Sequence, residues 1–534
     1  MKKAYIAVLA AGVASMSLTS CNDWLKEDGP GTNKLDDFFI SGAVAVQAVN
    51  ACYTPLAWEY NKTYFSEWYI GDIASDDALK GGQNVTDDNN AYDIDNFKVN
   101  INNGILLDYY RAKYQGIARC NLALQQVPQV DPDDSMTDSR RDCLMGEAYF
   151  MRALYYFQLV RVFGGVPLVD FVIDSSDRWI QPRASVQEVY EHIVADLKLA
   201  EGLLWNRGAY AAADLGRATR GAAQAFLCKA YLYMKDYDNA YLWGKKWVDE
   251  QYGSQYTLLS DYSLNFRLAG ENSSESVFEI QYMEDPTSDY GDANIGGFGF
   301  TRGTFTSILC RPRASVLGGK RGWGFDHPTH NLYAEYEAND PRRELTIGRF
   351  DDEVSEEVEV NYLGSSYYNI KNSYAEGDAF PSLSHDSRSP MNYKLMRASD
   401  ALLLYAEACL ESGKDLSAAK WALNEVRGRA RAMVNTPCLP DFPGYGYADT
   451  ADGLRAALRH ERRVELAMEG HRWFDLVRWG IAYEVLDRDN GSYGRTETEE
   501  ARAEMANFIK GKNELFPIPS EEINLNPMEQ NPGY

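Results

Sequence analysis

Three segments of this chain carry small and large apolar residues at helical spacing, and two of them are pairs of helices joined by a short break. Residues 222–248 (AAQAFLCKAYLYMKDYDNAYLWGKKWV) break at residues 235–236, and residues 401–427 (ALLLYAEACLESGKDLSAAKWALNEVR) break at residues 412–415. Residues 143–163 (CLMGEAYFMRALYYFQLVRVF) supply another long helix of the same kind. Apolar residues three and four positions apart line one face of a helix, so these segments must pack against other helices.

The alanines within each pair allow its two helices to approach closely. Ala230 and Ala240 leave room for contact, and Tyr231 and Tyr237 fill the space between the helices. The stretch LCKAYLYMKDYDNA, residues 227–240, follows the tetratricopeptide pattern nearly position by position. Because such hairpins cannot bury their apolar faces alone, several must stack. The chain is therefore predicted to be mainly α, with a tetratricopeptide-like helical hairpin scaffold.

Four further segments have helical periodicity: 40–59, 104–127, 185–204 and 453–480. Ser185 followed by Glu188 forms a capping-box pattern at the start of the third segment.

The middle of the chain lacks this period. From about 270 to 395, glycine, aspartate, serine and tyrosine dominate. Residues 276–283 (SVFEIQYM) predict a strand, and the glycines of residues 294–302 (NIGGFGFTR) predict a loop. Long loops in a compact protein are usually functional or disordered, and the high aromatic content argues against disorder. We therefore expect a loop-rich, aromatic insert with short strands at 271–395, between an N-terminal helical region at 40–270 and C-terminal helices at 396–534.

The N-terminus has the pattern of a secretory signal. Lys2 and Lys3 precede an apolar run over residues 4–18, and small residues lead to Cys21. A cysteine at this place is typical of a bacterial lipoprotein, in which the thiol is acylated and becomes the new N-terminus. The alternatives are an ordinary signal peptide or a membrane-spanning helix, but the run is too short to span a bilayer. We expect a signal peptide at 1–20, lipidation of Cys21 and a tether at 21–39, so that the protein is anchored to a membrane without crossing it.

Charge and composition narrow the partners. The formal net charge of −25 disfavours nucleic acid and anionic lipid. Aromatic residues make up 13% of the chain, and tyrosine and tryptophan offer flat faces that suit sugar rings. Seven cysteines remain beyond Cys21, with no CxxC pair, and those in helical patterns favour apolar packing.

Several motifs resemble the SusD/RagB family of outer-membrane nutrient-binding lipoproteins. Residues 459–480 (RHERRVELAMEGHRWFDLVRWG) are similar to the C-terminal signature ERRxELxxEGxRWxDLxRW of that family. Residues 515–519 (LFPIP) running to 531–534 (NPGY) resemble its chain end, and residues 155–169 (YYFQLVRVFGGVPLV) match a third motif. With Cys21, the motifs span the chain in the expected order.

The resemblance implies a surface-exposed lipoprotein of the cell outer membrane that captures oligosaccharides without catalysis. Such proteins deliver their ligand to a TonB-dependent, SusC-like transporter. No cofactor is predicted, and the net charge disfavours a nucleic-acid partner. The sequence leaves open a structural calcium ion, the identity of the glycan and the face of the outer membrane. The alternatives are a peptide-binding or scaffolding lipoprotein of the same fold and, from another class, an anchored glycoside hydrolase, which needs two suitably spaced carboxylates.

The charged signature is interpreted as structural. Glu461, Glu465 and Glu469 lie four apart on one helical stripe, and Arg462 and Arg472 each lie three residues from one of these glutamates. Ion pairing of these two arginines with the stripe is expected to offset its self-repulsion. A charged network that locks the last helix onto the scaffold is preferred over an acid–base pair. A metal site at His327 and His330 is disfavoured, because no third ligand is in view.

Ligand contacts in this family come mainly from loops with aromatic platforms. Trp323 between two glycines is the first expected contact, followed by Tyr290 and Tyr92. Asp77, Asn90 and Arg321 are the expected hydrogen-bonding side chains, by their proximity in sequence. No catalytic residue and no metal ligand is predicted.

Overall fold

The computed structural model describes residues 39–58, 68–283, 294–295, 298–299, 303–313, 321–350, 366–373, 389–487, 491 and 507–534. The scaffold is helical, and its helices are α3 Gly42–Tyr53, α4 Trp68–Ile73, α5 Asn89–Asp95, α6 Gly104–Gln126, α7 Asp138–Phe163, α8 Val186–Leu203, α9 Arg220–Tyr233, α10 Tyr237–Glu250, α14 Ala398–Ser412, α15 Leu416–Arg431, α16 Ala451–Glu465, α17 Arg472–Trp479, α18 Ala482–Leu486 and α21 Ser520–Leu525.

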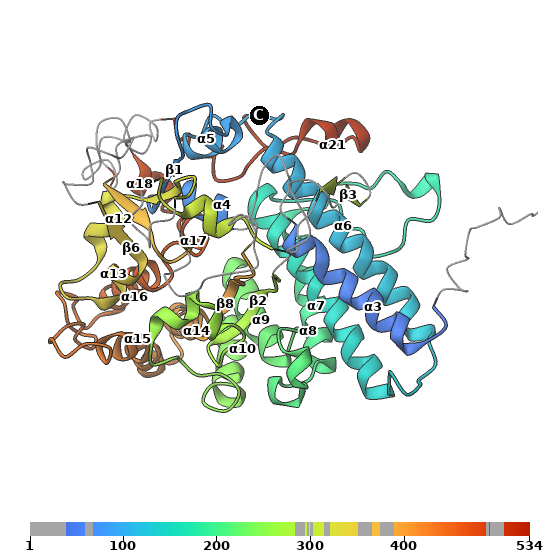
Figure 1. The fold of residues 1–534 in the computed structure, drawn as a ribbon, viewed down its shortest axis with the longest axis horizontal. Helices are drawn as coiled ribbons and strands as arrows, with labels where there is room; N and C mark the ends of the chain where they lie inside the picture. Colours follow the sequence, from blue (N-terminus) through green and yellow to red (C-terminus); the bar gives the residue numbers. More distant parts are fainter. Residues whose placement is uncertain are drawn as a thin grey trace, which may run out of the picture.

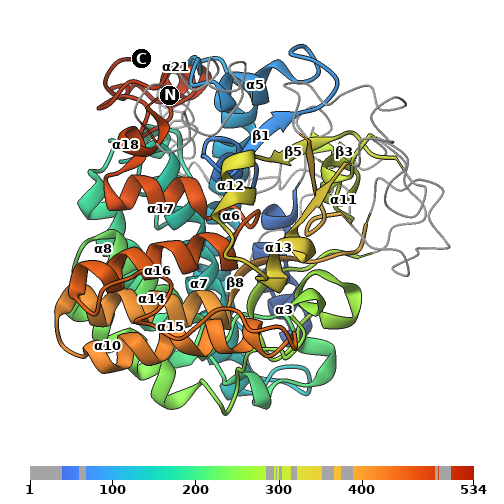
Figure 2. The same cartoon turned by 90° about the vertical axis from the view of Figure 1, so that its left-hand side faces the viewer.

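The helices stack in neighbouring pairs. α3, α6, α7 and α8 pack side by side on the right of Figure 1, and α8 continues into the α9–α10 pair. α10 packs on α14, and Figure 2 shows α14, α15 and α16 lying side by side. The prediction of a mainly α, tetratricopeptide-like fold is confirmed.

The predicted helices at 104–127, 143–163 and 185–204 are confirmed as α6, α7 and α8. The capping box at the start of α8 is present. The Glu188 backbone N–H donates to Ser185 Oγ at 3.2 Å, and the Ser185 N–H donates to Glu188 Oε2 at 2.8 Å. These two bonds satisfy N–H groups that a helix end would otherwise leave without partners.

The two predicted helix pairs are confirmed, with breaks where the sequence places them. Lys235 between α9 and α10 has φ 59°, and Gly413 between α14 and α15 has φ 66°. Gly244 of α10 faces Tyr405 of α14, and a Cβ there would lie 2.9 Å from the Tyr405 ring. The absence of a side chain at Gly244 therefore lets the two hairpins approach each other closely.

Two predicted helices are shorter than expected. The segment 453–480 is not one helix: α16 ends at Glu465 and α17 starts at Arg472, with Met468 at φ 61° and Gly470 at φ 72° between them. Left-handed backbone ends a helix, which the apolar spacing alone does not reveal. The segment 40–59 is α3 followed by the short 3₁₀ helix η1 (Thr54–Ala57), which has Pro55 near its start.

The other described segments include short helices and two-stranded sheets. Its helices are α11 Thr306–Cys310, α12 His330–Glu335 and α13 Pro341–Thr346, and its strands are β1 Ala78–Gly81, β2 Ser276–Ile280, β3 Asn294–Ile295, β4 Phe298–Gly299, β5 Phe325–Pro328, β6 Ile347–Arg349, β7 Tyr367–Asn369 and β8 Tyr393–Arg397. The predicted strand at 276–283 is confirmed as β2, whereas the predicted loop at 294–302 contains the pair β3–β4.

The sheets join segments that are far apart in sequence. β1 pairs antiparallel with β5, with Ala78 opposite Pro328 and Gly81 opposite Phe325. β2 pairs antiparallel with β8, and β6 pairs with β7. β1, which follows α4 near the start of the chain, is thereby fixed to the middle of the chain.

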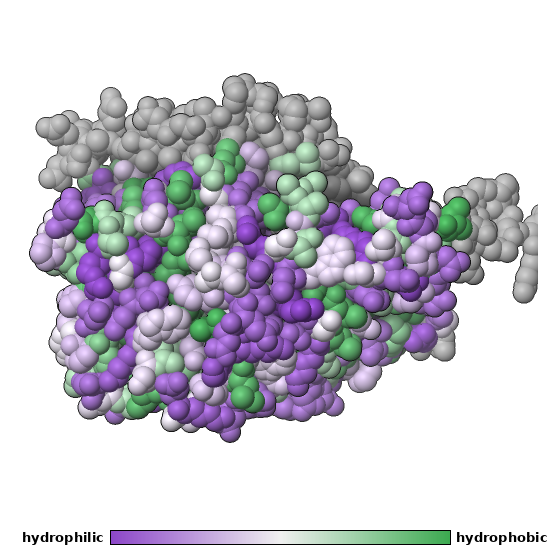
Figure 3. All heavy atoms as spheres, turned by 90° about the horizontal axis from the view of Figure 1, so that it is seen from below, coloured by the Kyte–Doolittle hydropathy of each residue, from purple (hydrophilic) through white to green (hydrophobic). Residues whose placement is uncertain are grey.

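The interior is one continuous apolar cluster that includes cysteines. Cys120, Cys143, Cys228 and Cys409 are buried in α6, α7, α9 and α14, as predicted for apolar packing, and all are free thiols. Seen from below, the surface is largely hydrophilic, with hydrophobic residues scattered over it (Figure 3). None of the helices that the structure describes is long and apolar enough to cross a membrane.

Candidate functional site

Trp323 lies on a turn that is tied to α11 by backbone hydrogen bonds. The Trp323 N–H donates to the Ile308 carbonyl at 2.8 Å, and the Gly322 N–H donates to the Pro312 carbonyl at 2.8 Å. A Cβ at Gly322 would lie 2.4 Å from the Arg311 carbonyl oxygen. The absence of a side chain at Gly322 therefore lets the backbone before Trp323 lie close to Arg311, and the tryptophan projects from a fixed turn.

The Trp323 ring is half-buried. It packs on Phe305, with ring centroids 6.2 Å apart and planes 35° apart. This support from Phe305 fixes the ring in place while part of its surface stays accessible. The Trp323 ring, supported by Phe305, is called the Trp323 platform below, because a fixed and partly accessible aromatic face is what stacking on a flat ligand requires.

The β1–β5 pairing brings a second loop to this platform. The Gly82 N–H donates to the Gly324 carbonyl at 2.6 Å, one residue from Trp323. Lys80 of β1 holds the start of the loop, since its ammonium group donates to the Asn84 carbonyl at 2.8 Å and lies 5.2 Å from the centre of the Phe325 ring. The polar loop over residues 83–88 therefore starts beside the Trp323 turn.

Asn90 and Tyr92 follow this loop, in α5. Asn90 Oδ1 accepts a hydrogen bond from the Gly104 N–H at 2.9 Å, and the Asn90 carbonyl accepts from Asn103 Nδ2 at 2.9 Å. The Asn90 side chain therefore caps the start of α6 and has less capacity for a ligand than its place in sequence predicts. Tyr92 is half-buried.

Asp77 lies inside the protein. It is 1% exposed, and its Oδ1 accepts from Arg463 Nε at 2.7 Å. Burial raises the pKa of Asp77, and Arg463 opposes that rise. Burial alone would also raise the pKa of Asp76, but the guanidinium groups of Arg463 and Arg472 outweigh it and lower the pKa to about 2. Through these arginines, the two carboxylates fix the chain just before β1.

The remaining predicted contacts differ in how they are placed. Arg321 is exposed, two residues before Trp323. Tyr290 lies outside the described residues, as does Cys21, the predicted lipidation site. Of the predicted ligand contacts, the structure thus brings Trp323, Arg321 and the loop leading to Asn90 and Tyr92 to the same part of the molecule.

His327 and His330, for which a metal site is disfavoured, both contact Tyr367. His327 Nδ1 lies 2.6 Å from the Tyr367 carbonyl, and His330 Nδ1 lies 2.9 Å from the Tyr367 hydroxyl. Burial lowers the pKa of His327 to about 4. Over the described ranges, no three His, Cys, Asp or Glu side chains are grouped closely enough to hold a metal ion.

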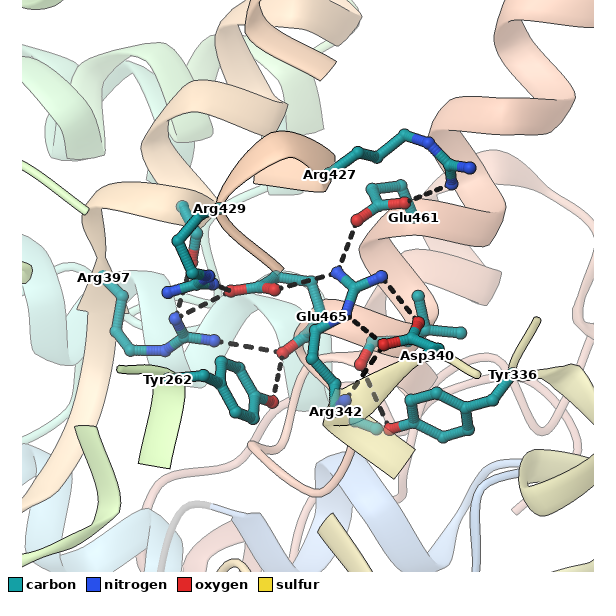
Figure 4. Close-up of polar contacts among 12 residues, drawn as sticks. Tyr262, Tyr336, Asp340, Arg342, Arg397, Arg427, Arg429, Glu461 and Glu465 are labelled. Carbon is teal, nitrogen blue, oxygen red and sulfur yellow. Dashed lines mark hydrogen bonds and ion pairs between the residues drawn. The ribbon is translucent and has the colours of Figure 1, made fainter. Parts of the chain in front are cut away.

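The glutamates of the C-terminal signature are held in a buried ionic network (Figure 4). Glu465 Oε1 accepts from Arg397 at 3.0 Å and from Arg429 at 2.5 Å, and its Oε2 accepts from Arg342 at 3.0 Å. Burial alone would raise the pKa of Glu465, but these arginines hold it well below its usual range. An acid–base role needs a carboxylate that can take up a proton near neutral pH, so the buried network at Glu465 favours the interpretation of the signature as structural.

The partners of the network were not those expected from spacing. Arg462 pairs with Asp400 at 2.8 Å and with Asp475 at 2.9 Å, and Arg472 pairs with Asp76 at 2.7 Å. The predicted pairing of these two arginines with the glutamate stripe is wrong, because the stripe faces arginines from other elements. Neighbours along one helix are visible in a sequence, whereas partners from other helices are not.

Sequence reasoning missed one further feature, a cavity of about 350 Å³ between the end of α3, the turn at residues 213–217 and the end of β2. Its walls come from segments more than 50 residues apart, such as Trp58, Arg217 and Gln281. No local motif marks such a site. The apolar residues around Trp58 are the only sequence signal for this cavity, and such a cluster is equally typical of a buried core.

Two family models match this chain. One, described as SusD family, matches residues 274–534, and the other, described as starch-binding associating with outer membrane, matches residues 71–232. Among curated proteins, the chain is similar to SusD-like protein P2 of Formosa agariphila, with 27% identity over 98% of each chain.

Solved structures share the fold. A laminarin-binding SusD-like protein superposes with a TM-score of 0.75 at 27% identity, over 93% of this chain and 100% of the other. Surface glycan-binding protein A from Bacteroides thetaiotaomicron, solved with laminarihexaose, superposes with a TM-score of 0.72 at 25% identity, over 91% of this chain and 98% of the other.

Proposed function

Because this chain belongs to the SusD/RagB family, we propose that it is a surface-exposed lipoprotein that binds oligo- or polysaccharide without catalysis and delivers it to a TonB-dependent, SusC-like transporter. Acylation of Cys21 would hold it at the outer membrane, with the binding body facing outside. The name of one matching family model, which includes starch binding and the outer membrane, supports this assignment.

The observation that carries the proposal is the aromatic platform at Trp323. The ring rests on Phe305, its turn is fixed by backbone hydrogen bonds, and the polar loop after β1 starts beside it. An aromatic face next to polar side chains matches a sugar ring, which has an apolar face and a rim of hydroxyl groups. Two similar structures are named for laminarin or for a laminarihexaose complex.

The absence of catalysis is supported by the state of the signature carboxylates. Glu461 and Glu465 are fully buried and paired with arginines, so neither is placed to protonate a glycosidic oxygen. The rival glycoside hydrolase is tested by incubating the protein with laminarin and starch, because release of any shorter oligosaccharide would refute the binding-only assignment.

Affinity electrophoresis through gels containing starch, laminarin, xyloglucan or galactomannan tests the platform directly. We expect Trp323→Ala to weaken retention by the bound polysaccharide at least about tenfold, which corresponds to about 1.4 kcal/mol. Trp179→Ala is the matched control, since Trp179 is 68% exposed on the separate loop before α8. If Trp323→Ala is retained as strongly as the wild type, the platform is not the binding site. If wild-type retention appears only on peptide ligands, the scaffolding alternative holds.

A further inference from the structure

We propose that the cavity beside Trp58 is a second sugar-binding subsite, separate from the Trp323 platform, that takes a neutral pyranose unit of the bound glycan. This inference rests on the proposed glycan-binding function and adds a second site to it. The cavity volume of about 350 Å³ lies within the range of small-molecule sites, roughly 300–1,000 Å³. Three other cavities of the described structure hold only about 20–30 Å³.

The cavity has a rigid apolar wall. Leu56 and Trp58 come from η1 and the residue after it, and Ile280 closes β2. The guanidinium group of Arg119, which does not line the cavity, lies 4.8 Å from the centre of the Trp58 ring and donates to the Ala51 carbonyl at 3.2 Å. Trp58 is thus fixed by Arg119, which lies outside the cavity, so the apolar wall of the cavity is formed before any ligand binds.

Polar groups line the cavity as well, and one of them, the Gln281 side chain, is held largely by residues outside it. The Gln281 amide exchanges hydrogen bonds with Asn272 at 2.8 and 3.1 Å and accepts from Asn392 Nδ2 at 3.1 Å. A Cβ at Gly216, where φ is 97°, would lie 2.5 Å from the Gln281 side chain, so this turn fits closely over the amide. The Gln281 Nε2 group also donates to the Glu279 carbonyl at 3.3 Å, so the hydrogen-bonding groups of this amide are used within the protein. Gln281 therefore gives the edge of the apolar wall a fixed shape and does not itself bind sugar hydroxyl groups.

The charged side chains in the cavity walls are paired with opposite charges, which favours a neutral ligand. Arg217 pairs with Asp214 at 2.5 Å and with Glu147 at 3.0 Å. Glu279 pairs with Lys394 at 3.3 Å. A charged ligand would lose its hydration on entering the cavity, and the wall charges, being paired already, would not compensate for that loss. A neutral, hydroxyl-rich ring with one apolar face avoids this cost.

The cavity is accessible, and it shares no wall with the platform. Met283 on its rim is 52% exposed, and Asn50 is exposed. Neither Trp323 nor its supporting residue Phe305 lines it. The two sites are nevertheless linked by the segment that leads into β8. Within it, Asn392 donates to Gln281 of the cavity wall. Three residues earlier, Ser389 forms an antiparallel β-bridge with Thr304, the residue before Phe305. A glycan chain that reaches both sites would bind with the advantage of two linked contacts.

Ala213→Trp tests the inference by filling the cavity from an exposed position on its rim. Ala211→Trp is the matched control, because Ala211 is also exposed but does not line the cavity. Both variants are compared with the wild type by affinity electrophoresis on starch, laminarin, xyloglucan and galactomannan. We expect Ala213→Trp to weaken retention on the bound polysaccharide at least fivefold, and Ala211→Trp to stay within twofold of the wild type.

Hydrogen exchange on the wild type gives a measurement that does not depend on a variant's folding. Adding the hexasaccharide of the retained polysaccharide should slow exchange in peptides covering residues 50–58 and 276–283. Unchanged retention of Ala213→Trp together with unchanged exchange there overturns the second subsite, while loss of retention in Trp323→Ala leaves the proposed function standing. A wild type that none of the four polysaccharides retains overturns both.

Discussion

Replacing His460 by glutamine should remove a pH-dependent part of the stability of this protein. His460 lies on α16, 6% exposed, with Nδ1 2.7 Å from Glu335 Oε1 and Nε2 3.3 Å from Glu337 Oε1. Burial by itself would lower its pKa, but the two glutamates outweigh this effect and raise the pKa to about 9. The other charged or titratable groups around it are Glu461, Arg427, Arg463, Tyr445 and Tyr447.

The magnitude follows from the pKa of His460 in the two states. An unfolded histidine has a pKa of about 6.5, and each factor of ten in proton affinity is worth about 1.4 kcal/mol. The rise to about 9 therefore corresponds to roughly 3 kcal/mol at most. The Glu335 side chain is 31% exposed, so solvent screens part of this interaction and we expect about 2 kcal/mol. Because the pKa is raised on folding, this stability is fully present below about pH 6.5 and is lost as the pH rises through about 9.

Urea unfolding of the wild type and His460→Gln, at pH values from 6 to 10, measures this difference. The gap in unfolding free energy should be about 2 kcal/mol at pH 6 and should shrink toward zero by pH 10. Other groups with shifted pKa values, such as Asp326 and Lys371, titrate in both proteins and cancel in the difference. A gap that stays constant over this range would show that His460 contributes through packing alone and would refute the charge argument.

Two further substitutions test the packing of the scaffold. Glu465→Gln leaves three arginines without their shared carboxylate and should lower the unfolding free energy by about 3–5 kcal/mol. The control Glu484→Gln, at an exposed pair with Lys510, should lower it by less than about 1 kcal/mol. Thermal melts that place both variants within a degree of each other would contradict this expectation. Gly71→Ala puts a Cβ 2.0 Å from the Gly470 carbonyl oxygen and should cost at least about 2 kcal/mol, while Gly202→Ala, with nothing within 4 Å, should be neutral or stabilising in the same melts.

The sequence predicted the scaffold well because its signals are local. Helical period, a capping box and polar breaks each involve residues within one or two turns, and α6 to α10, α14 and α15 appear where these signals lie. The failure at 453–480 has a local cause that the apolar pattern hides: Met468 adopts φ 61°, although methionine carries no signal for left-handed backbone. The pairing of β1 with β5 is not encoded locally either, because the two strands are more than 240 residues apart.

The site was predicted less well than the fold. Trp323 could be singled out by its glycines, but the reasons for those glycines are the close approach of Gly322 to the Arg311 backbone and the φ of 70° at Gly324, which only the fold reveals. Asp77 and Asn90 were selected by proximity in sequence, and the structure assigns both to internal hydrogen bonds and ion pairs. A polar residue in a loop is equally suited to bind a ligand and to hold the loop, and its sequence neighbours do not distinguish these roles.

The signature and the platform belong to one connected structure. Arg463 of α16 donates to Asp77 Oδ1 at 2.7 Å, just before β1, and to Asn331 Oδ1 at 2.7 Å, shortly after β5. Thr329 bonds to the same end, since its N–H donates to the Asp77 carbonyl at 2.9 Å. The opposite end of this ladder is the Gly82–Gly324 contact beside Trp323. Because a ladder fixed at one end keeps its register along its length, the buried charges of the signature set the position of the tryptophan turn. Asp77, predicted to contact a ligand, is a buried member of this clamp.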